Sequence, residues 1–177
     1  MDIKEWLSNR TRGGVHAPHR KNTAQCETVI MPPPERIILA MTQHIGAPCT
    51  PVVKVGDTVE VGQVVADSDK PVSAPIHSGV SGKVVSMTEL LLPGGMKTAA
   101  MVIESDGEQR IHPSVKPPVV ENYDDFIKAV RASGLVGLGG AGFPAHIKLH
   151  PRSLDDIDTV IVNAAECEPY ITSDYRE

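Results

Sequence analysis

The chain has 177 residues, enough for one ordinary domain or two small ones. Hydrophobic residues make up 41% of it and charged residues 22%, which is typical of a soluble globular protein, whereas aromatic residues contribute only 3%. The formal net charge of −5 argues against nucleic acid as a partner, because sequence-independent binding to phosphates requires a basic surface. No apolar run approaches the roughly 18 residues that a membrane-spanning helix needs.

The first 112 residues divide into two zones by composition. Residues 1–28 are polar and are expected to form an N-terminal arm. Between residues 29 and 112, short apolar runs alternate with turn signals such as GAP, VGD and LPGG, a pattern that predicts an all-β sandwich or barrel. The runs expected to form strands are RIILAM (36–41), PVVKV (51–55), QVVA (63–66), GKVVSM (82–87) and AAMVIES (99–105).

Two half-repeats within this zone are similar to the barrel-sandwich hybrid fold of biotinyl and lipoyl carrier domains. Each half combines a glycine-centred turn with a valine-rich strand, in VKVGDTVEVGQVVA and in APIHSGVSGKVV. Lys70 lies near the position at which carrier domains present their modified lysine. The Met-Lys-Met setting of biotinyl domains is missing, however, and Pro71 would disturb the hairpin of lipoyl domains. An exposed, unmodified Lys70 is therefore the preferred interpretation, with a carrier or docking module as the alternative.

A second domain is expected to begin after the proline-rich connection at residue 113. NYDDFIKAVRASG (122–134) predicts a helix capped by Asn122 or Asp124 and ended by Gly134. TVIVN (159–163) is short and β-branched, which predicts a strand buried in a parallel sheet. Because one helix and one strand cannot complete such a sheet, residues 113–177 are expected to be the truncated start of an α/β domain.

Between that helix and that strand lies the glycine loop, residues 134–142, which contains five glycines in nine positions. Glycines at positive φ can turn backbone N–H groups inward and form an anion site. Pro144 suits the start of a helix over PAHIKL, and Lys148 adds a positive charge. The loop matches neither GxGxxG nor a P-loop, so its residues alone leave a phosphate cradle and a plain tight turn equally open.

Polar side chains follow the predicted strand at its carboxyl end, where ligands collect in open α/β sheets. These are Asn163, Glu166 and Glu168, which could accept hydrogen bonds from a flavin, a ribose or a nicotinamide. Taken alone, the segment is more typical of a solvated acidic loop than of a ligand site. Cysteine and histidine spacing indicates no metal site: there is no CxxC pair, and neither His16 with His19 nor His146 with His150 has a third ligand nearby.

Together these motifs resemble a known family. GGVHAPHRKN, QHIGAPCTPVVKVGDTVEVGQVVA and VSAPIHSGVSGKVV are similar, in this order, to the N-terminal region of the C subunits of Rnf electron-transport complexes. GLGGAGFPAHIKL with NAAECEP resembles the same subunits and the NADH- and FMN-binding subunit of respiratory complex I. The resemblance implies that FMN contacts Gly137, Gly139, Gly140, Lys148, Asn163 and Glu166. It also implies that NADH contacts Phe143 and Glu168.

The fold class that follows is mainly β: a barrel-sandwich hybrid domain at 29–112, then the incomplete start of a flavin-binding domain at 113–177. The resemblance implies an NAD-linked oxidoreductase subunit that oxidises NADH through FMN and passes electrons to iron–sulfur clusters. The clusters are expected in a part of the subunit beyond this chain, which alone is expected to be inactive. Expected partners are NADH and the other Rnf subunits, at the cytoplasmic side of the cell membrane, to which this subunit is peripheral. A related cobalamin-reductase-type flavoprotein is the other enzymatic alternative.

Overall fold

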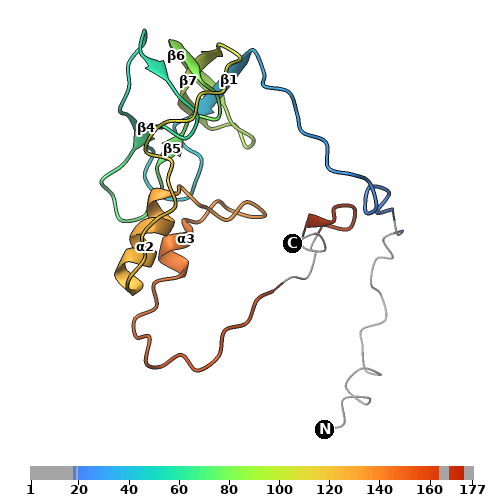
Figure 1. The fold of residues 1–177 in the computed structure, drawn as a ribbon, viewed down its shortest axis with the longest axis vertical. Coiled ribbons are helices and arrows are strands. Elements are labelled where there is room, and N and C mark those ends of the chain that lie inside the picture. Colours follow the sequence, from blue (N-terminus) through green and yellow to red (C-terminus); the bar gives the residue numbers. More distant parts are fainter. Residues whose placement is uncertain (1–17, 19, 164–167, 174–177) are drawn as a thin grey trace. The chain divides into compact units, whose positions relative to one another are not determined.

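The structure is a computed structural model, and it describes residues 18, 20–163 and 168–173. Residues 31–156 form one compact unit, and the described residues before and after this range belong to a second unit. The first unit contains all the strands and helices named here (Figure 1): β1 (Arg36–Ala40), β2 (Thr50–Pro51), β3 (Thr58–Val59), β4 (Val64–Asp67), β5 (Ile76–His77), β6 (Gly82–Leu91), β7 (Lys97–Ser105), α2 (Tyr123–Ala132) and α3 (Ala145–Lys148).

Two antiparallel sheets make up what we call the barrel module, residues 36–105. The larger sheet has the strand order β1-β7-β6-β3, and the smaller has the order β2-β4-β5. β1 pairs with β7 in the register Arg36↔Glu104 to Ala40↔Ala100. β6 and β7 form a long hairpin whose register shifts by a bulge between Val84 and Ser86. This is the mainly β, barrel-sandwich architecture that the sequence predicts.

The core of the barrel module is built from aliphatic side chains, as the low aromatic content requires. Val59, Val65, Val84, Met101 and Ile103 are fully buried and belong to one cluster that draws on both sheets. Burying a side chain of this size contributes about 1.5–3 kcal/mol. Period-2 alternation is clearest in the first half of β6, where buried and exposed residues take turns, and it stops where the hairpin extends beyond the core.

Helix α2 begins and ends where the sequence predicts. The side chain of Asn122 accepts a hydrogen bond from the backbone N–H of Asp125 at 3.0 Å, so Asn122 rather than Asp124 is the N-cap. Gly134 follows the helix with a φ of +71°, the left-handed conformation that commonly ends a helix. α3 is a single turn that starts directly after Pro144. The hydroxyl of Tyr123 donates to the carbonyl of Leu149, which ties the two helices together.

The strand predicted at residues 159–163 is not formed. Residues 160, 161 and 162 are irregular, and their side chains are 84–86% exposed. A strand needs a neighbour to pair its backbone N–H and C=O groups, and no strand in the described part of the chain pairs with this segment. The prediction of a buried strand is therefore wrong for this structure. Within the described residues, no helix has the length and apolar character required to cross a lipid bilayer.

Candidate functional site

The glycine loop folds as a narrow hairpin between α2 and α3. The backbone N–H of Gly137 donates to the carbonyl of Phe143 at 3.0 Å, and that of Gly142 donates to the carbonyl of Gly137 at 3.2 Å. A further bond joins the N–H of Ala145 to the carbonyl of Leu135 at 2.9 Å. These bonds hold the two arms of the hairpin together and leave residues 138–141 as its tip.

The glycines in special backbone conformations are not those predicted to contact FMN. Gly142 has a φ of +66°, in the left-handed region, whereas the φ angles of Gly137, Gly139 and Gly140 lie outside this region. A Cβ added to Gly139 or Gly140 would meet no atom within 4 Å. The inward turn expected from consecutive positive-φ glycines is therefore absent. The open geometry at the tip instead leaves its backbone accessible to a ligand.

Two features of the tip favour an anion. In the described part of the chain, the backbone N–H groups of residues 138–141 donate to no protein acceptor. Lys148 reaches back from α3, so that a Cβ added to Gly137 would lie 3.1 Å from its Nζ atom. No ion pair among the described residues involves Lys148. An ammonium at Gly137, next in sequence to N–H groups that have no protein acceptor among the described residues, is an arrangement suited to a phosphate.

The glycine loop rests on the barrel module. The backbone N–H of Ile45 donates to the carbonyl of Gly142 at 3.2 Å. A Cβ at Gly142 would lie 3.0 Å from the carbonyl oxygen of Gln43, so any larger residue would push the two segments apart. Pro144 is fully buried, and Gly134 packs against the carbonyl of Pro75. Both ends of the loop are thus fixed by the barrel, which lowers the entropy that ligand binding has to remove.

An open cavity of about 590 Å³ lies between the loop and the barrel module. Gly137, Leu138 and Gly140 line it from the loop, and the turn between β6 and β7 contributes Leu92 and Pro93. The segment that follows β1, residues 42–45, also lines it. Its volume falls within the range of ordinary small-molecule sites, roughly 300–1,000 Å³.

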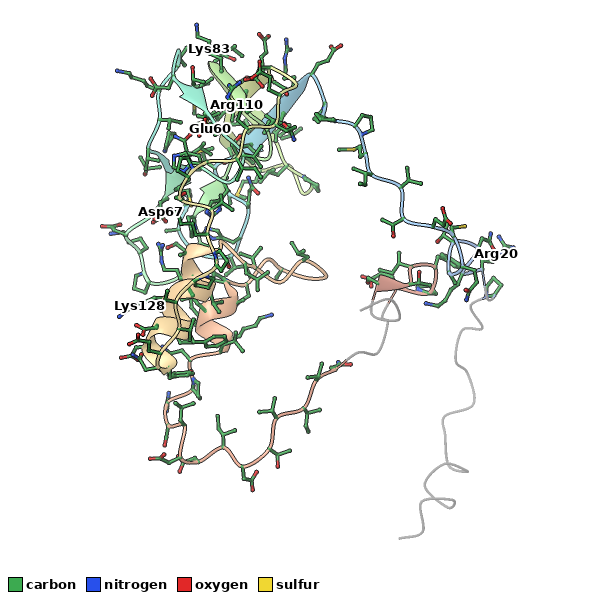
Figure 2. All side chains as sticks on the ribbon, viewed as in Figure 1. Arg20, Glu60, Asp67, Lys83, Arg110 and Lys128 are labelled. Atoms are coloured by element: carbon green, nitrogen blue, oxygen red, sulfur yellow. The ribbon has the colours of Figure 1, made fainter. Side chains whose placement is uncertain are left out.

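A bidentate ion pair fastens α2 to the barrel module. In it, the Arg131 guanidinium donates to the Asp67 carboxylate at 2.9 and 3.3 Å, and it also donates to the carbonyl of Ser68 at 2.9 Å. Asp67 lies at the end of β4, on the side of the barrel where the helices pack (Figure 2). The sequence does not predict this pair. Arg131 lies in the last turn of α2, where a cation is favourable because of the helix dipole alone. The sequence therefore explains a basic residue at this position but does not indicate which carboxylate it contacts.

We predict that the contribution of this pair to stability depends on pH. Burial tends to raise the pKa of Asp67, but the hydrogen bonds from Arg131 and from the Ser68 N–H outweigh it and hold this pKa below its usual value. A carboxyl whose pKa is lowered by folding stabilises the fold above its unfolded pKa, near 3.9, and the benefit disappears as the pH falls through the folded pKa. Both side chains are about one-third exposed, so Asp67→Asn should cost only about 1 kcal/mol at pH 7.

Urea unfolding of the wild type and of Asp67→Asn at a series of pH values measures this cost. It should shrink steadily below pH 4. Asp69→Asn is the matched control, because Asp69 lies only two residues further along the chain but is 87% exposed, and this substitution should have little effect at any pH. An Asp67→Asn penalty that is the same at pH 7 and pH 2.5 would contradict the ion-pair account.

The predicted site residues fall into both units. Gly137, Phe143 and Lys148 lie together in the first unit, in the hairpin and the short helix that follows it. Gly139 and Gly140 are exposed at the hairpin tip. The remaining residues predicted to contact FMN or NADH belong to the second unit or lie outside the described residues: Asn163 and Glu168 are in the second unit, and Glu166 is not described.

Comparisons with known proteins match both parts of the chain. Residues 9–108 match the family model described as the RnfC barrel sandwich hybrid domain, and residues 130–177 match that of the Nuo51 FMN-binding domain. The chain is 48% identical over 169 residues to the C subunit of the Na(+)-translocating ferredoxin:NAD(+) oxidoreductase complex of Acetobacterium woodii. It is 43% identical over 171 residues to the C subunit of the proton-translocating ferredoxin:NAD(+) oxidoreductase complex of Clostridium ljungdahlii. It is 41% identical over 170 residues to the C subunit of the ion-translocating oxidoreductase complex of Rhodobacter capsulatus.

Each of these three alignments covers 93% of this chain. The chain spans 38%, 37% and 33% of the lengths of the three relatives, respectively. The barrel match alone extends over more than half of the 177 residues, and the FMN-binding match follows it in the order that the sequence motifs predict. The chain therefore belongs to the RnfC family.

Proposed function

We propose that this chain is part of the NADH-oxidising, FMN-bearing subunit of an ion-translocating ferredoxin:NAD oxidoreductase complex. The observation that carries the proposal is the position of Lys148 beside Gly137, at the base of a loop tip whose N–H groups donate to no protein acceptor in the described part of the chain. That pairing lies inside the segment that matches an FMN-binding domain. The names of the Acetobacterium and Clostridium relatives, both C subunits of ferredoxin:NAD(+) oxidoreductase complexes, supply the reaction class.

The residues of this chain have distinct roles in the proposed site. Lys148 and the N–H groups of the loop tip bind the FMN phosphate, with Gly137, Gly139 and Gly140 allowing the ligand to approach the backbone. Asn163 and Glu166 complete the flavin contacts, while Phe143 and Glu168 contact NADH. A bound flavin supplies the hydride chemistry, and the protein orients the two nucleotides and excludes water.

The rest of the assignment concerns the complex as a whole. Iron–sulfur clusters receive the electrons from the flavin, and no residue of this chain is proposed to ligate them. The partners are the other Rnf subunits, with which this subunit associates peripherally at the cytoplasmic side of the membrane. No nucleic acid is involved.

Neither alternative function gains support from the structure. A carrier domain needs its lysine at the tip of a freely accessible hairpin, and Lys70 lies in the connection between β4 and β5, residues 68–75. Arg131 of α2 binds the carbonyl of Ser68 in this connection and also contacts the hydroxyl of Ser73. The connection is thus bonded to α2 on both sides of Lys70, unlike the free hairpin of a carrier domain. A cobalamin-reductase-type flavoprotein is disfavoured by the RnfC barrel match at residues 9–108.

FMN titration tests the proposed function. We expect the full-length protein to bind FMN and quench its fluorescence, whereas residues 1–177 alone should bind it weakly. The physical reason is that the loop tip is exposed and the segment at 159–163 has no strand to pair with among the described residues, so few walls enclose the ring. Absence of binding by the full-length protein would overturn the proposal, and tight stoichiometric binding by residues 1–177 would show that the site is more complete than proposed.

A further inference from the structure

The cavity beside the glycine loop has a second wall that belongs to the barrel module. Residues 42–45 follow β1, and Leu92 and Pro93 form the turn between β6 and β7. Neither segment lies in the part of the chain that matches an FMN-binding domain. The barrel therefore contributes surface at the place where the proposed function puts a nucleotide.

This second wall is held in place from within the barrel. His44 is only 7% exposed, and its Nε2 atom accepts a hydrogen bond from the backbone N–H of Ala74 at 3.1 Å. The side-chain amide of Gln43 donates to the carbonyl of Ala40 at 3.1 Å. From this rigid segment, the N–H of Ile45 reaches the carbonyl of Gly142. The spacing between the two walls is thus set by the fold before any ligand binds, as a preorganised site requires.

The two ends of the cavity differ in chemistry. Gly137 is part of its lining and also lies beside the ammonium of Lys148, so the anion-binding groups are at the loop end. The barrel end combines the apolar side chains of Ile45 and Leu92 with the polar segment 42–44. The side chain of Ile45 is 48% exposed, and that of Leu138 across the cavity is 88% exposed. A ligand with a phosphate at one end and, at the other, a flat ring that has apolar faces and a polar edge matches this arrangement, and FMN has this form.

We propose that the barrel module forms one wall of the FMN site, in which Ile45 and Leu92 pack against the isoalloxazine ring while the loop tip and Lys148 hold the phosphate. This inference rests on the proposed function and adds to it two binding residues outside the flavin domain. On this account the barrel module belongs to the cofactor site and is not an independent module joined to the flavin domain. Burial of the ring against Ile45 and Leu92 supplies apolar contact that the glycine loop cannot.

The test is FMN binding by the full-length protein, measured by fluorescence quenching, with a carboxylate placed on each segment of the wall. Ile45→Asp and Leu92→Asp should each weaken binding at least tenfold, because the ring would have to desolvate a charge that also repels the phosphate. Val55→Asp is the matched control: Val55 is 53% exposed, lies on the barrel module and does not line the cavity. The Val55→Asp variant should bind FMN as tightly as the wild type does.

A second measurement does not depend on substitutions. Amide hydrogen exchange with and without FMN should show slowed exchange in peptides covering residues 42–46 and 90–96 of the wild type, and no change around Val55. Two results would overturn the proposal that the barrel forms a wall of the site and leave the proposed function standing. In the first, Lys148→Ala weakens FMN binding but both aspartate variants bind FMN normally. In the second, FMN does not slow exchange in the two barrel peptides. If the full-length protein binds no FMN, both fail together.

Discussion

Replacing Lys148 by alanine is expected to weaken FMN binding by the full-length protein about 10- to 150-fold. This range corresponds to the loss of one charge-assisted hydrogen bond, about 1.5–3 kcal/mol. Lys148 is exposed, and no ion pair among the described residues engages it, so its removal leaves no buried group without a partner. The effect should therefore appear in ligand affinity and not in the free energy of unfolding.

Riboflavin, which has the same ring without the phosphate, separates the possible causes. It should bind the wild type and Lys148→Ala equally, because the lysine is proposed to contact the phosphate alone. Lys128→Ala is the matched control: Lys128 is a 78% exposed lysine on α2, whose nearest carboxylate is the Asp125 oxygen at 3.9 Å (Figure 2). Equal losses of FMN affinity in both variants would indicate a general effect of net charge. An equal loss of riboflavin binding in Lys148→Ala would place the lysine at the ring.

Elements with strong local signals were predictable from the sequence. β1, β4 and β7 fall on the predicted apolar runs almost residue for residue, because alternation and turn residues there agree with the barrel core. The Asn122 cap and Gly134 likewise delimit α2, since capping depends on neighbouring residues only. The run PVVKV, by contrast, contributes only Pro51 to β2, and two-residue strands such as β5 carry too little pattern to be recognised.

Features that depend on distant partners were not predictable. The TVIVN segment has the composition of a buried strand, but a strand exists only where another pairs with it, and local composition says nothing of that partner. The Arg131–Asp67 pair joins residues 64 positions apart. The contact of Gly142 with residues 43–45 is equally non-local. The sequence reveals the glycine-rich loop but does not indicate the surface against which the loop packs.

The backbone conformation of Gly46, in the barrel segment beside the site, leads to a second prediction with a large expected effect. Gly46 has a φ of +117°, and a Cβ at this position would lie 2.0 Å from the carbonyl oxygen of Val72. That carbonyl already accepts the N–H of Ala47 at 3.2 Å, so it cannot move away without breaking a bond. Gly46→Ala should therefore lower the free energy of unfolding by about 3 kcal/mol or more, through backbone strain and a clash together.

Comparison with Gly56→Ala separates the cost of backbone strain in Gly46→Ala from the cost of the clash. Gly56 also has a positive φ, +99°, but a Cβ there would meet no atom within 4 Å, so this variant carries the backbone strain without the clash. We expect it to lose about 1–2 kcal/mol in urea unfolding followed by circular dichroism, clearly less than Gly46→Ala. The clash in Gly46→Ala should also displace the preceding residue, Ile45, whose N–H donates to the carbonyl of Gly142. Faster amide exchange across residues 137–145 should accompany Gly46→Ala and be absent in Gly56→Ala. Equal stability losses in the two variants, with unchanged exchange in the loop, would mean that the barrel does not hold the glycine loop in place.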